Sequence, residues 1–356
     1  MTGSPVDIYL FAPLAPILCM LLFWFLQLVF IESQKHLLIT ISENHQPFFR
    51  LTNFIGIFFQ AICQALGYTI TRSGISHFEV SVTEETVTPK QEKKGSREWL
   101  AKAILFIGPF FLPAALLLIC LFFLMGNGFV FTSLTDYTFS DNLQAFGKNF
   151  LNFAENLFSF LASLDFFNPF HAGFFVLLVF FGLGIRPSST GEGKRDKITF
   201  KHDLDNIKSL IFEKPLFILL LVFAAYIFYY ITFFFQFSWY LNVFTVFTWL
   251  SFLAIVALVI THLIILLIRS TDEIQGRKKI IPYLTLPLSY ITTRIVLFAF
   301  NVQDTQARPA SLGVMILLTV VVIIILLLKN RTNRFKTKKM MKPRRVKDGP
   351  RRTAQQ

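Results

Sequence analysis

The sequence is poor in charged residues, which make up only 15% of its 356 residues, whereas 54% are hydrophobic. A soluble domain of this length needs many more polar and charged residues to cover its surface. The composition therefore excludes a soluble globular protein and indicates an integral membrane protein. Forty-five phenylalanines against only six histidines also argue against a metal-rich soluble enzyme.

Cysteine is equally scarce. The three cysteines are Cys19, Cys63 and Cys120, and each lies within an apolar run. An odd number without paired spacing excludes a disulfide framework and a CxxC metal site. We expect all three to be small apolar residues of the core.

Acidic residues are absent from the apolar runs, although the chain contains 21 aspartates and glutamates. Proton-coupled carriers usually keep a carboxylate inside the membrane, because a buried group that titrates couples the proton to the solute. A transporter or channel is therefore only the second alternative to the leading function of this chain.

Long apolar runs dominate what is present. Eight segments reach or nearly reach the length that crosses a bilayer. They are residues 8–31, 48–66, 101–125, 168–186, 215–236, 241–268, 280–300 and 311–328. We predict an all-α membrane domain over residues 1–328 with eight transmembrane helices.

Basic residues are distributed very unevenly between the connecting segments. If the N-terminus is cytoplasmic, 27 of the 34 lysines and arginines fall in the segments 67–100, 187–214, 269–279 and 329–356, on the cytoplasmic side, and only three fall in the outer segments. Cytoplasmic loops of membrane proteins carry such an excess. We therefore predict that both termini are cytoplasmic.

Two connecting segments have patterns of their own. Residues 77–82 (HFEVSV) alternate between apolar and polar side chains, which predicts a short cytoplasmic β-strand or hairpin after the second span. The outer segment 126–167 predicts an amphipathic helix lying flat in the membrane interface, with a partner-binding helix as the alternative. Its apolar positions are Phe146, Phe150, Leu157, Leu161 and Leu164.

The C-terminal segment 329–356 contains twelve basic residues and a single acid, Asp348. Such a composition predicts a disordered cytoplasmic tail that anchors the topology and contacts anionic lipid. Binding of ribosomal RNA is a second interpretation, because a polybasic segment binds any polyanion.

The most informative stretch is FIGIFFQAICQALGYTI, residues 54–70. Gln60 and Gln64 are four residues apart, on one face of an apolar helix. Two amides in hydrocarbon are costly unless they form hydrogen bonds. The simplest interpretation is a pair that bonds to neighbouring helices.

This stretch also resembles the site-two protease family of intramembrane zinc proteases, whose members carry HExxH on a membrane helix. Here the five positions read Gln60-Ala61-Ile62-Cys63-Gln64. The strand-like segment 77–82 and the Gly-Pro break within residues 104–119 are similar to the segments that come after the motif in that family. Residues 174–196 are similar to a later span of smaller bacterial and archaeal members. There an aspartate supplies the third zinc ligand, for which Asp196 or Asp203 is the candidate here.

The resemblance implies a member that has lost its chemistry. Gln60, Ala61 and Gln64 stand at the former active-site positions, and neither an amide nor an alanine replaces a zinc-bound imidazole or a general base. The expectation is a protein without catalytic residues, metal or cofactor. It would bind or sequester another membrane protein or a peptide, in a prokaryotic plasma membrane.

Four other polar sites lead to alternatives. A cluster of His77, His202 and Asp203 would rebuild a metal site near the glutamine pair. Arg294 lies inside a predicted span, where it snorkels to the interface or pairs with an acid such as Asp165.

Arg294 could also mark a hydrophilic groove. A cation in such a groove, together with the basic tail, would suit an insertase or ribosome-tethered assembly factor. His171 and His262 lie near the ends of their spans, where we expect structural hydrogen bonds.

Overall fold

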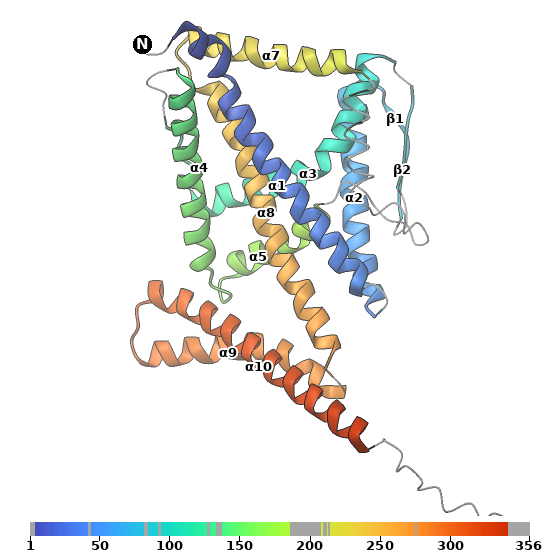
Figure 1. Ribbon diagram of the computed structural model, residues 1–356, viewed down its shortest axis with the longest axis vertical. Coiled ribbons are helices and arrows are strands. Elements are labelled where there is room, and N and C mark those ends of the chain that lie inside the picture. Colours follow the sequence, from blue (N-terminus) through green and yellow to red (C-terminus); the bar gives the residue numbers. More distant parts are fainter. Residues whose placement is uncertain are drawn as a thin grey trace, which may run out of the picture. The chain divides into compact units, whose positions relative to one another are not determined.

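The computed structural model describes residues 4–41, 44–81, 85–91, 94–126, 129–132, 137–185, 208, 212, 214–274 and 276–340, with side chains as far as 330. Its elements (Figure 1) are η1 (Asp7–Phe11), α1 (Leu14–Ile41), α2 (Gln46–Ile70), β1 (Ile75–Val80), β2 (Glu85–Pro89), α3 (Ser96–Met125), α4 (Phe139–Ala162), α5 (Pro169–Gly184), α7 (Pro215–Phe234), α8 (Trp239–Asp272), η3 (Gly276–Ile280), α9 (Ile281–Ala299) and α10 (Asp304–Met340). The chain divides into two compact units, Met1–Leu267 and Ile268–Gln356.

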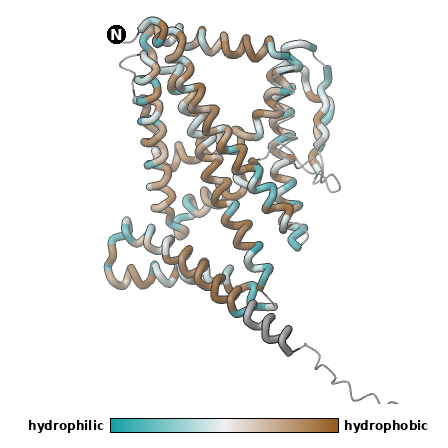
Figure 2. Tube along the Cα trace, in the orientation of Figure 1, coloured by the Kyte–Doolittle hydropathy of each residue, from teal (hydrophilic) through white to brown (hydrophobic). Residues whose placement is uncertain are grey.

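Apolar residues run along most of these helices, as Figure 2 shows. In the described part of the chain, seven helical stretches are long and apolar enough to cross a membrane. They are Asp7–Ile41, Gln46–Ile70, Ser96–Met125, Pro215–Phe234, Trp239–Asp272, Gly276–Ala299 and Asp304–Asn330. This confirms the prediction of an all-α, multi-pass membrane protein.

The predicted span at 168–186 corresponds to α5, which is apolar but only 16 residues long. At 1.5 Å per residue, α5 is about 24 Å long, against roughly 30 Å for the hydrocarbon core of a bilayer. Asn168 caps the helix by accepting a hydrogen bond from the backbone N–H of Phe170. Among the described helices, seven rather than the predicted eight have spanning length.

α1 and α8 run in the same direction (Figure 1). At the start of α8, the hydroxyl group of Tyr240 donates a 2.6 Å hydrogen bond to the carbonyl oxygen of Pro13, just before α1. Farther along both helices, the rings of Phe23 and Phe252 meet edge to face at 6.4 Å. The predicted alternation of inner and outer loops requires these two helices to run in opposite directions, so the arrangement differs from the prediction.

The difference arises from α7, which lies across the ends of its neighbours rather than beside them (Figure 1). Near its start, the ring of Phe217 contacts that of Trp99 in the first turn of α3 at 5.4 Å. In its second half, Tyr229 reaches η1. Because α7 connects these two ends, α8 begins at the same end as α1. The cytoplasmic location of both termini stays a prediction.

α4 is the amphipathic helix expected in segment 126–167. It begins after Thr138, whose side chain accepts a hydrogen bond from the backbone N–H of Asp141. The prediction that it lies flat in the interface is wrong, because its apolar face packs inside the unit. Phe146 clusters with Leu241 of α8, and Phe150 contacts Phe23 of α1 at 4.5 Å.

α3 contains two prolines, Pro109 and Pro113, and bends where they lie (Figure 1). A proline inside a helix removes a backbone donor and frees carbonyl groups on the preceding turn. In α1, Gln27 is fully buried, and its side-chain amide donates a 2.9 Å hydrogen bond to the carbonyl oxygen of Phe110. The bend is therefore stabilised by a polar side chain from another helix.

A two-stranded antiparallel hairpin follows α2, where the sequence predicts a strand. Phe78 of β1 pairs with Val87 of β2. The chain enters β1 through Gly74, whose positive φ of 66° is readily available only to a residue without a Cβ. The segment 77–82 thus begins inside β1, although the strand itself starts two residues earlier.

The second unit contains the end of α8, η3, α9 and α10. Thr271 and Tyr283 share a hydroxyl–hydroxyl hydrogen bond of 2.8 Å, which fixes the turn between α8 and α9. α10 continues to Met340, past residue 328, where the sequence predicts the start of a disordered tail. The remainder of that tail, 341–356, lies outside the described residues.

Candidate functional site

Within the five positions compared above with HExxH, Gln60, Ala61 and Cys63 lie in the packed interior of the first unit. Ala61 is fully buried, Cys63 is 1% exposed and Gln60 is 6% exposed. Cys63 is a free cysteine, as predicted. Buried among apolar neighbours, these residues form part of the packing of α2.

Gln64 takes a different direction from Gln60. Its side-chain amide nitrogen donates to the hydroxyl group of Tyr68 and to the carbonyl oxygen of Val87, each at 3.2 Å. The second bond attaches β2 of the hairpin to α2. The sequence predicts a bond to a neighbouring helix, but the described partners of Gln64 are Tyr68 of the same helix and Val87 of a strand.

Small residues allow neighbouring helices to approach α2 closely. A Cβ atom at Gly108 of α3 would lie 2.8 Å from the Sγ atom of Cys63, and one at Gly184 would lie 2.7 Å from the ring of Phe59. Such contacts are typical of helix packing in membranes. They pack α3 and α5 against the face of α2 that carries Phe59 and Cys63.

Within the described ranges, no group of three or more His, Cys, Asp and Glu side chains could hold a metal ion. His77 lies on β1, where its Nε2 atom is 3.2 Å from a carboxylate oxygen of Glu79, and both side chains are exposed. The other candidate ligands, Asp196, His202 and Asp203, lie outside the described residues. The arrangement that can be described offers zinc no ligand set.

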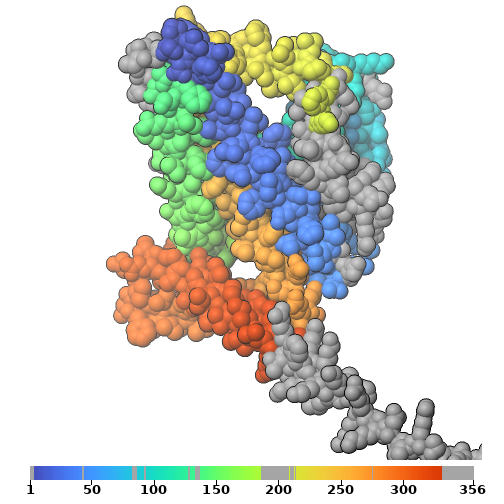
Figure 3. Space-filling model, viewed as in Figure 1, coloured from blue at the N-terminus to red at the C-terminus, as the bar shows by residue number. Residues whose placement is uncertain are grey.

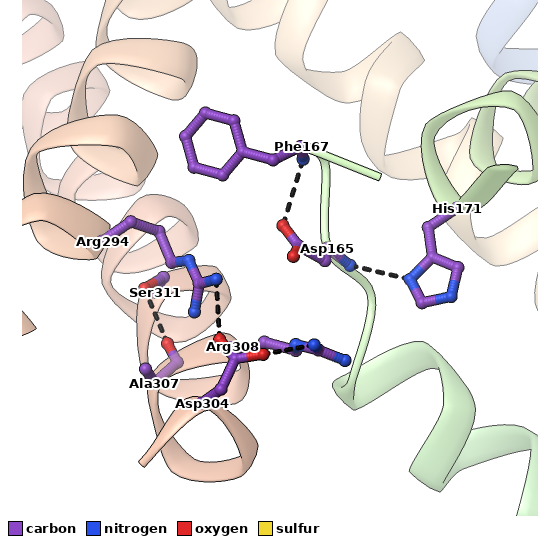
Figure 4. A network of polar contacts seen from close by, with 8 residues as sticks. All are labelled: Asp165, Phe167, His171, Arg294, Asp304, Ala307, Arg308 and Ser311. Carbon is purple, nitrogen blue, oxygen red and sulfur yellow. Dashed lines mark hydrogen bonds and ion pairs between the residues drawn. The ribbon is translucent and has the colours of Figure 1, made fainter. Parts of the chain in front are cut away.

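His171 stabilises the turn between α4 and α5. Its Nδ1 atom accepts a 3.1 Å hydrogen bond from the backbone N–H of Asp165, whose carboxylate in turn accepts one from the backbone N–H of Phe167 at 3.0 Å (Figure 4). The ring of Phe160 meets the imidazole edge to face. The expected structural role of His171 is therefore confirmed.

His262 lies on α8, one residue after Thr261, which is fully buried. The Nδ1 atom of His262 is buried, and no group in the described part of the chain pairs with it. Neighbouring α5 approaches α8 closely here, because a Cβ atom at Gly182 would lie 2.7 Å from the carbonyl oxygen of Ala257. His262 thus borders a tight helix contact.

Arg294 of α9 is only 15% exposed and lies 2.8 Å from a carboxylate oxygen of Asp304, at the start of α10. Arg308, one turn along α10, bonds to the other oxygen of the same carboxylate (Figure 4). Arg294 therefore has a carboxylate partner within its own unit, on the next helix. Sequence reasoning proposed an acid as partner but named Asp165.

Two polar residues of α1 were missed by the sequence reasoning. Gln27 bonds to the bend of α3, and Gln34 donates from its side chain to the carbonyl oxygen of Gly182 at 3.5 Å. Both are almost fully buried. The signal was available, since they are seven residues apart and lie on one face of an apolar helix.

Tyrosines of α7 and α8 surround the first residues of the chain. The hydroxyl groups of Tyr226, Tyr229 and Tyr230 donate to the carbonyl oxygens of Leu10, Ile8 and Tyr9, respectively. In a helix as short as η1, the backbone carbonyl groups near the C-terminal end have no N–H partner within the helix. The tyrosine hydroxyl groups supply that donor. Nothing in the sequence pattern pairs residues so far apart.

No protein-family model, curated protein or solved structure matches the chain.

Proposed function

We propose that this chain is a non-catalytic, multi-pass membrane protein that holds an extended segment of another membrane protein at its β1–β2 hairpin. The observation that carries the proposal is the hydrogen bond from Gln64 to Val87. It attaches the hairpin to α2 through a residue that, in the resemblance to site-two proteases, stands where a zinc ligand would be. The scaffold is then used for binding instead of hydrolysis.

The absence of catalysis follows from the side chains themselves. Hydrolysis by this kind of site needs a metal to activate water and a carboxylate to accept its proton. Gln60 and Gln64 are poor zinc ligands, and Ala61 has no group that could act as a base. Each of these three positions instead contributes to packing or to the attachment of the hairpin.

Binding of an extended segment is supported by the exposure of β1. Residues 75–79 are all exposed, including the large apolar side chains of Ile75 and Phe78. The sheet contains two strands in the part of the chain that the structure describes, so the outer edge of β1 pairs with no described strand. Such an edge pairs readily with an extended peptide, through backbone hydrogen bonds.

The two alternatives have less support. An insertase was suggested by a cation inside the membrane, but the guanidinium group of Arg294 lies 2.8 Å from the carboxylate of Asp304. A transporter would need an observation that favours a solute path through the bundle. The prokaryotic plasma membrane and the contact of tail 329–356 with anionic lipid or ribosomal RNA are parts of the proposal that depend on the sequence alone.

The proposal is tested by placing a photo-crosslinking amino acid at Phe78 and irradiating native membranes. We expect one discrete adduct with another membrane protein, because the side chain of Phe78 is 48% exposed on the open strand. The same group at Phe158 of α4, which is 54% exposed, serves as the matched control and should give little adduct.

A second variant tests whether formation of the adduct depends on the attachment of the hairpin to α2. Gln64→Leu removes the amide that bonds to Val87 and should reduce the adduct at Phe78 severalfold. Equal adducts at Phe78 and Phe158, or an adduct that Gln64→Leu leaves unchanged, would contradict the proposal. Adducts only with a second copy of this chain would indicate self-association instead.

A further inference from the structure

Buried polar atoms gather where α4 packs beside α8, away from the hairpin. Asn142 and Asn149 of α4 and Thr245 of α8 are all fully buried. No described group pairs with the Oδ1 atom of Asn142, the Nδ2 atom of Asn149 or the Oγ1 atom of Thr245. Trp249 adds a fourth such atom, its indole Nε1.

The register of the two helices brings Asn149 and Thr245 to the same level, whereas Asn142 lies two turns earlier in α4. Ala145 and Phe146 cluster with Leu241, and the ring of Phe153 stacks on that of Trp249 with centroids 4.8 Å apart. The two helices therefore run in parallel in this region. Asn149 lies one turn before Phe153, and Thr245 lies one turn before Trp249, so both belong to the same layer of the interface.

The site is enclosed by aromatic rings. A second ring stacks on the indole of Trp249, that of Phe131, at 4.9 Å and nearly parallel. Next to it, the backbone N–H of Thr132 donates a 2.7 Å hydrogen bond to the Oδ1 atom of Asn149. This bond fixes the orientation of the amide, so its NH₂ group is the donor that no described group accepts.

Hydrogen-bonding groups buried in this way almost always have a partner, and in a membrane-spanning bundle bulk solvent cannot supply one. Asn149 and Thr245 lie roughly 9 to 15 Å from the starts of their helices, well inside a bilayer that α8 would cross. Together Asn149, Thr245 and Trp249 offer two N–H donors and a hydroxyl group. None is charged, so an ion would find no counter-charge among them.

We propose that the α4–α8 interface is a built internal site that binds water between Asn149, Thr245 and Trp249. Water is the smallest molecule that donates and accepts at once, and a buried water typically makes two to four such bonds. The site gives the membrane domain a fixed polar layer, and it is independent of the proposed binding at the hairpin.

Hydroxyl-radical footprinting of the full chain in lipid nanodiscs tests this site. X-rays convert bound water into hydroxyl radicals in place, so a buried ring is oxidised only if water lies beside it. Phe153 and Phe59 are each 1% exposed and form a matched pair. We expect Phe153 and Trp249 to be oxidised severalfold more than Phe59.

Two hydroxyl groups of α8 supply the matched variants. Thr245 and Thr248 are both fully buried, but the hydroxyl group of Thr248 donates to the carbonyl oxygen of Phe244 at 3.0 Å. Thr245→Val should therefore reduce the oxidation of Trp249 severalfold, while Thr248→Val should leave it unchanged. If Thr245→Val fails to fold, Asn149→Leu is a second variant that should reduce the oxidation of Trp249.

Two results would overturn the proposal. If Phe153 and Trp249 are oxidised no more than Phe59, no water is bound beside them. If they are oxidised but Thr245→Val and Asn149→Leu change nothing, radicals reach the rings from bulk solvent and not from a polar site.

Discussion

The hydroxyl group of Tyr229 in α7 donates a 2.9 Å hydrogen bond to the carbonyl oxygen of Ile8 in η1, 221 residues earlier in the sequence. The side chain of Tyr229 is 1% exposed. It therefore connects the cross-lying helix α7 to the first residues of the chain through a buried polar contact, in a region where water does not compete.

Tyr229→Phe should lower the free energy of unfolding by about 1–3 kcal/mol, because it leaves the buried carbonyl group of Ile8 without this donor. Tyr230→Phe is the matched control, since Tyr230 makes the same kind of bond to Tyr9 but is exposed. Its effect should be much smaller. Thermal denaturation in detergent measures both, and equal losses would show that burial does not decide the strength of these bonds.

Gln27→Leu should destabilise the first unit by about 1–3 kcal/mol, because the amide of Gln27 supplies a donor to the bend of α3. Gln34→Leu removes a bond that is longer, 3.5 Å against 2.9 Å, and should cost less. Denaturant unfolding followed by tryptophan fluorescence compares the two. A larger loss for Gln34→Leu would show that the bend does not depend on Gln27.

Gly182→Ala should destabilise the contact between α5 and α8 by about 1–3 kcal/mol, the usual range for overpacking. The added Cβ atom would lie 2.7 Å from the carbonyl oxygen of Ala257, and a backbone atom cannot move aside as a flexible side chain can. Gly173→Ala, in the same helix, meets nothing within 4 Å. It should be neutral or stabilising by up to about 1 kcal/mol, because alanine favours helix.

Elemental analysis of the purified chain should find far less than one zinc per molecule. Gln60, Ala61 and Gln64 offer no imidazole, thiolate or carboxylate, and zinc in proteins is bound by those groups. About one zinc per chain that disappears in His77→Ala would show instead a rebuilt ligand set. Proteolysis would then replace binding as the proposed function.

The sequence could predict that certain polar side chains form hydrogen bonds or ion pairs, but it could not predict which residues they bond to. Two amides four residues apart on an apolar helix indicated hydrogen bonds, and Gln64 makes one. Its partner is a backbone carbonyl group of β2, however, and nothing in the sequence shows which strand residue lies beside which turn of α2. In the same way an acid was expected for Arg294, and Asp304 could not be distinguished from other acids without the fold.

The sequence alone determined that this is an all-α, multi-pass membrane protein, because hydrophobicity over a helix length is a property of each segment by itself. The alternation of residues 77–82 also predicts a short strand or hairpin after α2. The tertiary structure decided which way the helices run. α1 and α8 are parallel because α7 lies across their ends, where Tyr229 of α7 bonds to Ile8. The bond from Tyr240 to Pro13 then joins the start of α8 to the segment just before α1.

Which polar side chains are buried together was likewise decided by the tertiary structure alone. In Figure 3, α1 (blue) and α4 (green) lie next to each other on the visible face of the first unit. Asn149 of α4 and Thr245 of α8 are both fully buried. Along the sequence Asn149 belongs to an ordinary amphipathic helix and Thr245 to an ordinary apolar one. Their meeting depends on the register of α4 against α8, which is set by the shapes of rings such as Phe153 and Trp249 and not by hydropathy.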